Sequence, residues 1–400
     1  MERLKSIPYG ISNFEQIINR NYYYVDKTMY LPLLERAANN LLLIRPRRFG
    51  KSLFIDMMKA YYDISEKDKF QEMFGNLWIG GKPTDEQGMY QVLYFDFSKA
   101  NLGEGTLEHN FNVYCNEQLE RFLLRYASFY PKEEMERVLK NDSAASKLHW
   151  IEAAAKAMGY PLYLIIDEYD NFTNVVLSES GPETFYNLTH ANGFYREYFK
   201  QFKGMFYRIF LTGVSPITLD DLTSGFNIDW NISNEPRFNA MLGFDEQDVR
   251  TMFRYYQEGG ILKGDIDAMI QEMKPWYDNY CFSRKSLQDP RLFNCDTVLY
   301  YLQHRVESGE APEQMLSKNI RTDYSKLEML VRLDKDITLR GQRMSTIEEI
   351  TTKEEILVDL KTSFPANDMV KAENYRSLLY YYGLLTISGV RGNRLKMCIP

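Results

Sequence analysis

The stretch LLLIRPRRFGKS, residues 41–52, contains the strongest structural signal in the chain. Its first four residues, LLLI, form a short apolar run that is typical of a buried parallel strand. Its last three, Gly50-Lys51-Ser52, end the phosphate-binding P-loop pattern G-x-x-x-x-G-K-[ST]. Helical spacing then runs from Ser52 to about Tyr62. A strand, a loop and a helix in this order form the setting that a P-loop requires.

Arg45 stands where the pattern has its first glycine. Pro46 follows it, and a residue before proline is pushed toward extended conformations. Arg45 can therefore continue the strand without the positive φ angle that only glycine adopts cheaply. We predict that the loop is intact and that the missing glycine costs little.

The end of the loop carries the groups that phosphate binding needs. Gly50 lets the backbone approach the nucleotide, Lys51 can reach the β- and γ-phosphates, and the Ser52 hydroxyl can bind Mg²⁺. The helix that follows directs its positive end at the phosphates. ATP and Mg²⁺ are the predicted cofactors. The loop residues predicted to bind the nucleotide are Arg45, Pro46, Arg47, Arg48, Phe49, Gly50, Lys51, Ser52 and Leu53.

A second motif, LIIDE, ends the apolar strand expected within residues 161–172, as a Walker B sequence should. Asp167 is predicted to hold Mg²⁺ through water, and Glu168 to orient or deprotonate the attacking water. An acidic pair after a strand can also be a helix cap or part of a surface loop. The two motifs, each at the end of a strand and in the right order, favour a nucleotide site with Lys51 and Glu168 as catalytic residues.

The rest of the chain up to about residue 244 alternates between strand and helix patterns. Further strands are expected at residues 91–97 and 205–217, and helical patterns at 26–40, 105–158 and 181–204. This alternation predicts an α/β fold, a P-loop NTPase parallel sheet with helices on both faces.

Beyond residue 244 the expected elements are helices with no strand between them. The last segment, 373–400, reads as one helix and two short strands around Arg391-Gly392-Asn393, which favours a winged-helix module. We therefore expect a P-loop ATPase domain over residues 1–244 and a helical and winged-helix-like region over residues 245–400.

The composition is that of a globular protein, with 44% hydrophobic and 26% charged residues. The 30 tyrosines and 24 phenylalanines are expected to fill the core and the domain contacts. A formal net charge of −7 argues against a polycation that binds nucleic acid or membrane with its whole surface. The four cysteines and four histidines show no metal-ligand spacing. The N-terminus lacks an apolar targeting segment, so we expect a cytoplasmic protein that does not enter a membrane.

At these motifs the sequence resembles the AAA-ATPase-like family of bacterial proteins, which is related to signal-transduction (STAND) and archaeal-type ATPases. The family's P-loop commonly has the form x-R-R-x-G-K-[ST], so Arg45 is no sign of decay. The matching segments are YYYVDKT (22–28), RPRRFGKS (45–52), LIIDEYD (164–170), LTGVSPI (211–217), DDLTSGFN (220–227), PRFNAMLGF (236–244) and WYDNYCFS (276–283).

Six further residues are weaker site candidates, and two of them, Thr212 and Arg237, are predicted to be catalytic. Thr212, at the end of a later strand, either senses the γ-phosphate or simply ends the strand. Arg237 either supplies charge to the γ-phosphate as a sensor or finger, or makes a structural salt bridge. Tyr24 and Asp26 lie where related ATPases place the base, so they are adenine-site candidates. Arg47 and Arg48 either contact phosphates or face a partner domain.

In many family members a PD-(D/E)XK nuclease-like domain follows, and it would be expected to begin where this chain stops, at Pro400. The chain is then either a fragment or a natural short form. Within it, Asp359-Leu360-Lys361 matches half of a nuclease motif. The segment lies inside the expected helical and winged region, so we predict no nuclease site here.

Three functions compete. The first is an ATP-binding and ATP-hydrolysing switch, in which nucleotide state changes the angle of the C-terminal helices and controls a nuclease-like effector domain or a partner protein. The second is a winged-helix regulator that binds nucleic acid through Arg391, Arg394 and Lys396, with the nucleotide in a structural role. Three basic residues near a turn are also typical of a solvated surface. The third is an interaction module that binds no nucleotide.

Overall fold

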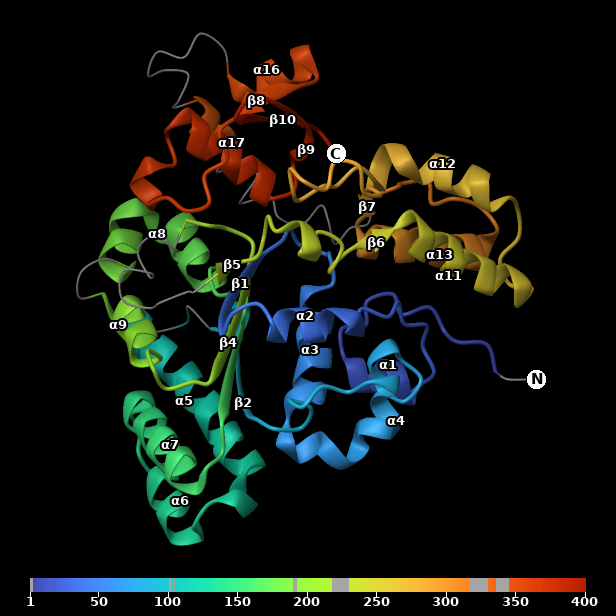
Figure 1. Ribbon diagram of the computed structural model, residues 1–400. Helices are drawn as coiled ribbons and strands as arrows, with labels where there is room; N and C mark the ends of the chain where they lie inside the picture. The colour runs from blue at the N-terminus through green and yellow to red at the C-terminus, as the bar shows by residue number, and fades with distance from the viewer. Residues whose placement is uncertain are drawn as a thin grey trace.

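A computed structural model of the protein describes residues 3–100, 103, 105–189, 193–217, 230–316, 330–335 and 345–400. A parallel sheet of five strands forms the centre of the fold (Figure 1). All neighbouring strands pair in parallel, in the order β2-β3-β4-β1-β5. The strands are β1 (Asn40–Ile44), β2 (Gln91–Asp96), β3 (Leu162–Asp167), β4 (Arg208–Gly213) and β5 (Trp230–Asn231). The predicted α/β fold is confirmed.

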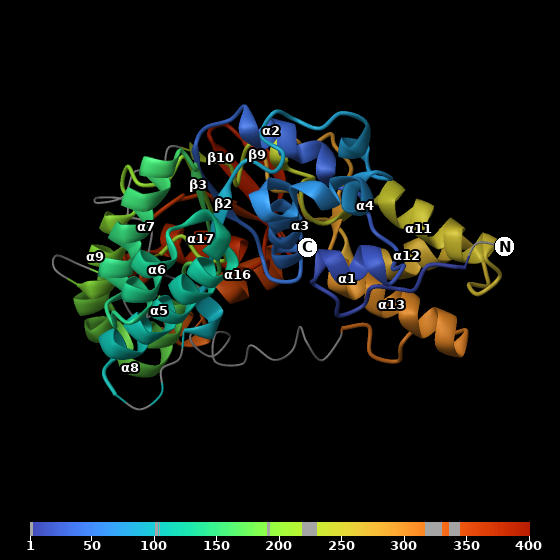
Figure 2. The same cartoon turned by 90° about the horizontal axis from the view of Figure 1, so that it is seen from below.

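Helices cover both faces of this sheet (Figure 1, Figure 2). Every residue of β3 and β4 is buried, because a parallel sheet that is covered on both faces leaves no strand face to solvent. On one face lie α1 (Phe14–Asn19), α2 (Leu31–Glu35), α3 (Lys51–Tyr62) and α4 (Phe70–Phe74). On the other lie α5 (Leu107–Arg125), α6 (Lys132–Leu139), α7 (Ala144–Met158), α8 (Asn171–Thr189) and α9 (Phe194–Gln201).

The helix expected over residues 26–40 is much shorter in the structure. A 3₁₀ turn over Thr28–Tyr30 leads into α2, which ends at Glu35. The chain then turns so that β1 can begin at Asn40 and pair with β4.

A second apolar core lies around α11 (Glu246–Glu258), α12 (Ile266–Tyr277) and α13 (Cys295–Ser308). The N-terminal segment packs against it through Leu4, Ile7, Tyr9, Tyr23 and Val25. The expectation of no strand between these helices is wrong. β7 (Leu292–Phe293) lies between α12 and α13 and pairs antiparallel with β6 (Phe244–Asp245).

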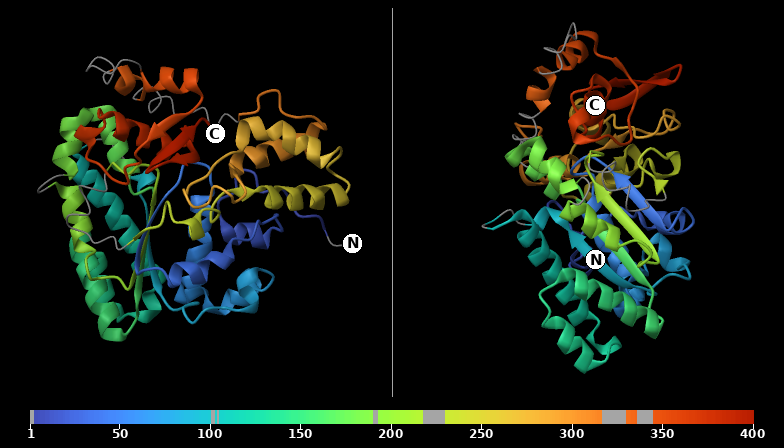
Figure 3. Two further views of the ribbon diagram at one scale, coloured as in Figure 1. Left: turned by 45° about the horizontal axis from the view of Figure 1, so that its top comes forward. Right: turned by 90° about the vertical axis from the view of Figure 1, so that its left-hand side faces the viewer.

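The C-terminal residues form a separate antiparallel sheet in the order β8-β10-β9 (Figure 3). The expected helix is present as α17, and the two expected strands join through a turn at Gly392. β8 was not expected. The elements are α16 (Thr346–Lys353), β8 (Ile356–Val358), α17 (Ala372–Tyr381), β9 (Thr386–Arg391) and β10 (Arg394–Cys398). Their designation as a winged helix, like the domain boundary at residue 244, stays a prediction.

Among the residues that the structure describes, no helix is both long enough and apolar enough to cross a membrane. The segment DDLTSGFN (220–227), which contributes to the family resemblance, lies outside the described residues.

Candidate nucleotide-binding site

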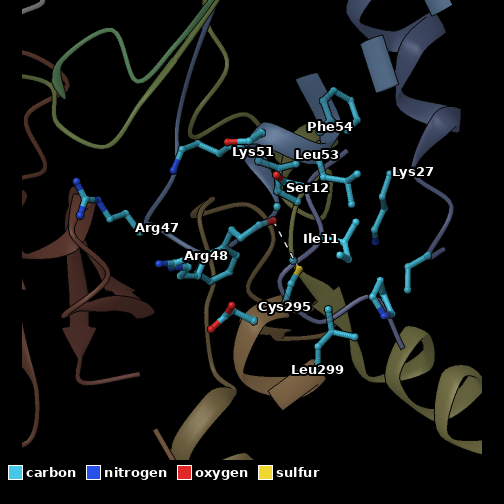
Figure 4. A pocket seen from close by; sticks show the side chains of 18 of the residues that line it. Ile11, Ser12, Lys27, Arg47, Arg48, Lys51, Leu53, Phe54, Cys295 and Leu299 are labelled. Carbon is cyan, nitrogen blue, oxygen red and sulfur yellow. Dashed lines mark hydrogen bonds between the residues drawn. The ribbon is translucent and has the colours of Figure 1, made fainter. Parts of the chain in front are cut away.

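A pocket of about 440 Å³ opens where β1 ends and the P-loop begins. Its walls are the P-loop, the N-terminal segment, the carboxylates at the ends of β2 and β3, and parts of α11 and α13. Figure 4 shows Arg47 and Arg48 on one side of the pocket and Ile11 and Lys27 on the opposite side.

The backbone of the P-loop has the shape of an anion-binding loop. Gly50 has φ +89°, a left-handed conformation that glycine adopts without strain. Helix α3 begins at the next residue, Lys51, so its unpaired N–H groups and positive dipole end lie at the pocket. Ser52 and Leu53, in the first turn of this helix, also line the pocket, as predicted.

The Lys51 side chain is buried between its own loop and the end of β3. Its ammonium donates to the carbonyl oxygens of Arg45 and Pro46, at 3.1 Å each. It also lies 3.7 Å from Oε1 of Glu168. Lys51 and Glu168, two of the residues predicted to be catalytic, therefore lie next to one another at the pocket.

Asp167 joins the ends of three elements. Its carboxylate accepts hydrogen bonds from the Ser52 hydroxyl at 2.7 Å, the Thr212 hydroxyl at 2.6 Å and the backbone N–H of Glu168 at 3.0 Å. Only 2% of Asp167 is exposed, and this burial, together with the nearby charge of Glu168, raises the pKa of its carboxyl. The structure thus brings together Ser52, Asp167 and Thr212 as the motifs predict.

The oxygen atoms of Ser52 and Asp167 suit Mg²⁺, which prefers hard oxygen ligands. Within the described ranges there is no group of three or more His, Cys, Asp or Glu side chains that could hold a metal by itself. Mg²⁺ sites commonly take one or two protein ligands and complete their coordination with phosphate oxygens and water. The residues present fit a magnesium ion that arrives with a nucleotide.

With this geometry established, comparison with known proteins assigns the family. The family model described as predicted AAA-ATPase matches residues 8–223, which is more than half of the chain. The chain belongs to the predicted AAA-ATPase family.

Two known proteins are similar to this chain. An uncharacterized protein in the vnfD 5′ region of Azotobacter chroococcum mcd 1 is 26% identical over 292 residues, which cover 72% of this chain. The chain spans about half the length of that relative, since the match covers 50% of it. The solved structure of the Aeropyrum pernix ORC2 protein, in ADPNP-ADP complexes, aligns with 96% of this chain and 93% of its own, at 13% identity and a TM-score of 0.40.

The pocket contains two carboxylates that the sequence motifs did not single out, Asp96 and Asp296. Asp96 ends β2, lies beside Asp167 in the register of the sheet, and lines the pocket. Lys99 pairs with it at 2.9 Å. Its signal in the sequence was the acidic residue at the end of the predicted strand QVLYFDF, which resembles the end of β3.

Asp170 was also missed, because its role depends on a neighbouring strand. It is buried, and its carboxylate accepts from the backbone N–H groups of Val214 at 3.1 Å and Ser215 at 2.7 Å. Tyr169 donates its hydroxyl to the carbonyl oxygen of Ser215 at 2.5 Å. These bonds fix the end of β4, and with it Thr212, against the residues that follow β3.

We expect Gly213→Ala to destabilise the protein at this junction. A Cβ atom at Gly213 would lie 2.4 Å from Oδ1 of Asp170 and 2.4 Å from the Tyr169 ring. Overpacking of this kind typically costs about 1–3 kcal/mol. Denaturant unfolding of the two proteins measures the difference.

Gly81→Ala is the matched control, because a Cβ at Gly81 meets nothing within 4 Å. It should unfold at the wild-type midpoint. If Gly213→Ala were as stable as Gly81→Ala, the bonds between Asp170 and the end of β4 would not be rigid.

The predicted place of the Arg45 side chain beside the phosphates is wrong. The guanidinium group is buried on the other side of the loop, where it donates to the carbonyl oxygens of Ser233 and Phe238. Neither Arg45 nor Pro46 is among the residues that line the pocket. Pro46 instead packs against Gly383. The two are so close that a Cβ atom added to Gly383 would lie 2.8 Å from the proline ring.

Two weaker candidates also lie away from the pocket. Asp26 accepts from the backbone N–H groups of Thr28 and Trp78, so it caps a turn rather than contacting a ligand. Arg237 is exposed, with its guanidinium carbon 4.6 Å from the centre of the Trp230 ring. Its position supports neither the sensor role nor the salt bridge within the described part of the chain. Tyr24 lines the pocket, and its role at the adenine base stays a prediction.

The carbonyl groups of the P-loop are held by the segment that starts α13. Asn294 donates its side-chain amide to the carbonyl of Arg47 at 3.3 Å, and the N–H of Asp296 donates to that of Arg48 at 3.4 Å. The Cys295 thiol donates to the carbonyl of Phe49 at 3.6 Å (Figure 4). Three successive carbonyls of the loop are therefore bound by the segment that starts α13.

Proposed function

We propose that this AAA-ATPase binds Mg-ATP at the P-loop and hydrolyses it. The observation that carries the proposal is the convergence of five predicted residues at the carboxyl ends of β1, β3 and β4. These residues are Lys51, Ser52, Asp167, Glu168 and Thr212. Membership of the predicted AAA-ATPase family supports nucleotide binding of the same kind.

Each residue has one role in this proposal. Lys51 places a positive charge on the β- and γ-phosphates, and the N-terminus of α3 receives them. Ser52 and Asp167 hold Mg²⁺, which neutralises phosphate charge when bound. Glu168 orients the attacking water and accepts its proton. Thr212 holds the Asp167 carboxylate in place through its 2.6 Å hydrogen bond.

The base is proposed to lie between the N-terminal segment and α13. Ile11 and Tyr24 line the pocket from the N-terminal side, and Leu299 lines it from α13. Burial raises the pKa of Tyr24 far above its ordinary value, which is itself high enough to keep the phenol neutral at physiological pH. Apolar and aromatic walls of this kind suit a planar purine ring.

We further propose that nucleotide state acts on the region after residue 244 and, through it, on an effector domain or partner protein. Support comes from the contacts that this region makes with the loop, from Asn294 to Asp296. The Phe49 ring adds to them, since it packs edge-on against Tyr280 and Phe282 at 4.8 and 5.3 Å between ring centroids.

No specific observation favours the nucleic-acid alternative. Arg394 pairs with Glu373 at 2.6 Å and Lys396 with Glu355 at 2.8 Å, so carboxylates already neutralise two of the three basic residues. In the half-motif Asp359-Leu360-Lys361 the charged side chains neutralise one another, because the aspartate and the lysine form an ion pair at 2.5 Å.

Lys51→Ala tests the proposal directly. Mg-ATP at a hundred times its Kd should stabilise the wild type by about 2.7 kcal/mol, and thermal unfolding should show this as a higher midpoint. A hydrogen bond to a charged group contributes about 1.5–3 kcal/mol, so Lys51→Ala should bind Mg-ATP about 10- to 100-fold more weakly. Titration calorimetry measures the change in affinity.

Lys59→Ala is the control on the same helix. Lys59 pairs with Asp56 at 2.9 Å and does not line the pocket, so this variant should bind Mg-ATP with wild-type affinity. A wild-type protein that Mg-ATP does not stabilise would overturn the proposed function. Equal affinity in wild type and Lys51→Ala would overturn the P-loop assignment.

A further inference from the structure

The guanidinium group of Arg45 is buried in an unusual setting. Only 1% of the residue is exposed, and within the described ranges no carboxylate forms an ion pair with it. Burial lowers the pKa of the guanidinium to about 10. An arginine charge is costly to bury, so its position has to be fixed by good hydrogen bonds.

Those bonds are made to backbone carbonyls. One terminal nitrogen, Nη1, donates to Ile44 at 3.0 Å and to Ser233 at 2.5 Å, and Nη2 donates to Phe238 at 3.0 Å. The guanidinium carbon also lies 4.2 Å from the centre of the Phe282 ring, within the range of a cation–π contact.

The groups that hold Arg45 are themselves joined. The Ser233 hydroxyl accepts the N–H of Ile44 at 2.7 Å, so the end of β1 is bound to this segment twice. Asn239 accepts the N–H of Phe282 at 2.8 Å, and Asn234 donates to the Phe282 carbonyl at 2.9 Å. Segment 233–239 and segment 276–283 therefore form one support for the Arg45 side chain.

The backbone of the same residue touches the nucleotide-binding lysine. The carbonyl oxygen of Arg45 accepts from Lys51 Nζ at 3.1 Å, and the N–H of Arg45 donates to the carbonyl of Gly213 at 3.2 Å. A glycine at this position could provide the carbonyl, but it could not attach that carbonyl to the two supporting segments.

We propose that Arg45 is a positioning residue for Lys51: its buried side chain fixes the carbonyl that holds the Lys51 ammonium, and so sets the reach of Lys51 toward the phosphates. This inference rests on the proposed function, in which Lys51 binds the β- and γ-phosphates. The same contacts couple segment 276–283 to the site, because a shift of Phe282 would move the Arg45 side chain and, with it, the Arg45 carbonyl that binds Lys51.

The test compares Arg45→Met with Arg208→Met. Arg208 is a second buried arginine, on β4, that donates to the carbonyl of Glu35 at 3.0 Å and pairs with Glu86. It begins β4, whereas Thr212 and Gly213 of the site end it. Both variants should lower the unfolding temperature. Only Arg45→Met should change the position of the Lys51 ammonium and therefore its rate of acylation.

The readout for Lys51 needs no nucleotide. The rate at which N-hydroxysuccinimidyl acetate acylates Lys51, followed by mass spectrometry, should rise about tenfold in Arg45→Met, the factor that corresponds to about 1.4 kcal/mol of lost hydrogen bonding. The rate in Arg208→Met should equal that of the wild type. Mg-ATP affinity, measured in parallel, should fall in Arg45→Met and stay unchanged in Arg208→Met.

Arg45→Lys keeps the charge but cannot make the forked set of bonds, so it should raise the acylation rate less than Arg45→Met does. If Arg45→Met does not fold, the acylation rate of Lys51 in Arg45→Lys provides the test. An acylation rate that is unchanged in the Arg45 variants would overturn the inference, even if wild type binds Mg-ATP normally. A wild type that binds no Mg-ATP would instead overturn the proposed function, while the acylation rates still decide whether Arg45 holds Lys51.

Discussion

Replacing Glu168 with glutamine is expected to leave Mg-ATP bound and to lower the rate of hydrolysis by about 10²- to 10⁴-fold. The glutamine side chain has almost the same shape, but its amide cannot accept a proton from the attacking water. Glu168 lines the pocket, and its carboxylate lies 3.7 Å from the Lys51 ammonium. Single-turnover hydrolysis and titration calorimetry measure the two properties separately.

The backbone at Glu168 supports this role. Its φ of +52° is uncommon for a residue other than glycine, and such strain is often found at functional sites. The N–H of Glu168 donates to Oδ1 of Asp167, and the N–H of Asn171 donates to the carbonyl of Glu168 at 2.8 Å. These bonds hold the side chain toward the pocket.

Asp96→Asn tests whether another carboxylate of the pocket, rather than Glu168, accepts the proton. Asp96 lines the same pocket but is paired with Lys99, which favours a positioning role. We expect this variant to retain most of the hydrolysis rate. Wild-type turnover in Glu168→Gln, together with a large loss in Asp96→Asn, would transfer the catalytic role to Asp96.

The sheet and the centre of the site could be predicted because their signals are local. β1, β3 and β4 are buried on both faces, so each reads as a nearly continuous apolar run. Parallel strands end at the same edge, so polar residues at those ends, such as Ser52 after β1, Asp167 and Thr212, had to meet. Asp96 also ends a parallel strand and lies at the same edge of the sheet. The sequence did not indicate it as a site residue because no second acidic residue stands beside it.

The elements that sequence reasoning missed depend on distant contacts. β5, β6 and β7 have two residues each, which is too short for any periodic pattern. Sequence reasoning places the Arg45 side chain beside the phosphates because its neighbours in the chain are predicted to bind them. Its direction is set instead by Ser233 and Phe238, which lie 188 and 193 positions away. A single sequence contains no signal for such partners.

Asp167→Asn is expected to have two effects of opposite sign. In the absence of nucleotide the variant should unfold at a higher temperature than wild type at pH 7. In the presence of Mg-ATP it should gain much less stability, because the asparagine cannot supply the negative charge that holds Mg²⁺. Thermal unfolding between pH 4 and 8, with and without Mg-ATP, measures both effects.

The first effect follows from the raised pKa of the Asp167 carboxyl, which burial causes and the charge of Glu168 increases. Folding therefore favours the protonated form, so the stability that this group contributes is present at low pH and is lost as the pH rises through its folded pKa. Asparagine stays neutral at every pH. The advantage of the variant should accordingly be largest near pH 7 and shrink as the pH approaches the ordinary value for aspartate.

Asp170→Asn, three residues further along the chain, is expected to have the opposite effect on the unfolding temperature. Asp170 is equally buried, but its carboxylate accepts two backbone N–H groups from Val214 and Ser215, which an amide cannot serve as well. This variant should unfold at a lower temperature than wild type, with or without nucleotide. A lower unfolding temperature for Asp167→Asn without Mg-ATP would mean that the bonds from Ser52 and Thr212 outweigh the cost of burying the charge. Both aspartates would then stabilise the fold. That result would contradict the prediction that the Asp167 carboxylate destabilises the nucleotide-free protein and contributes only when Mg-ATP binds.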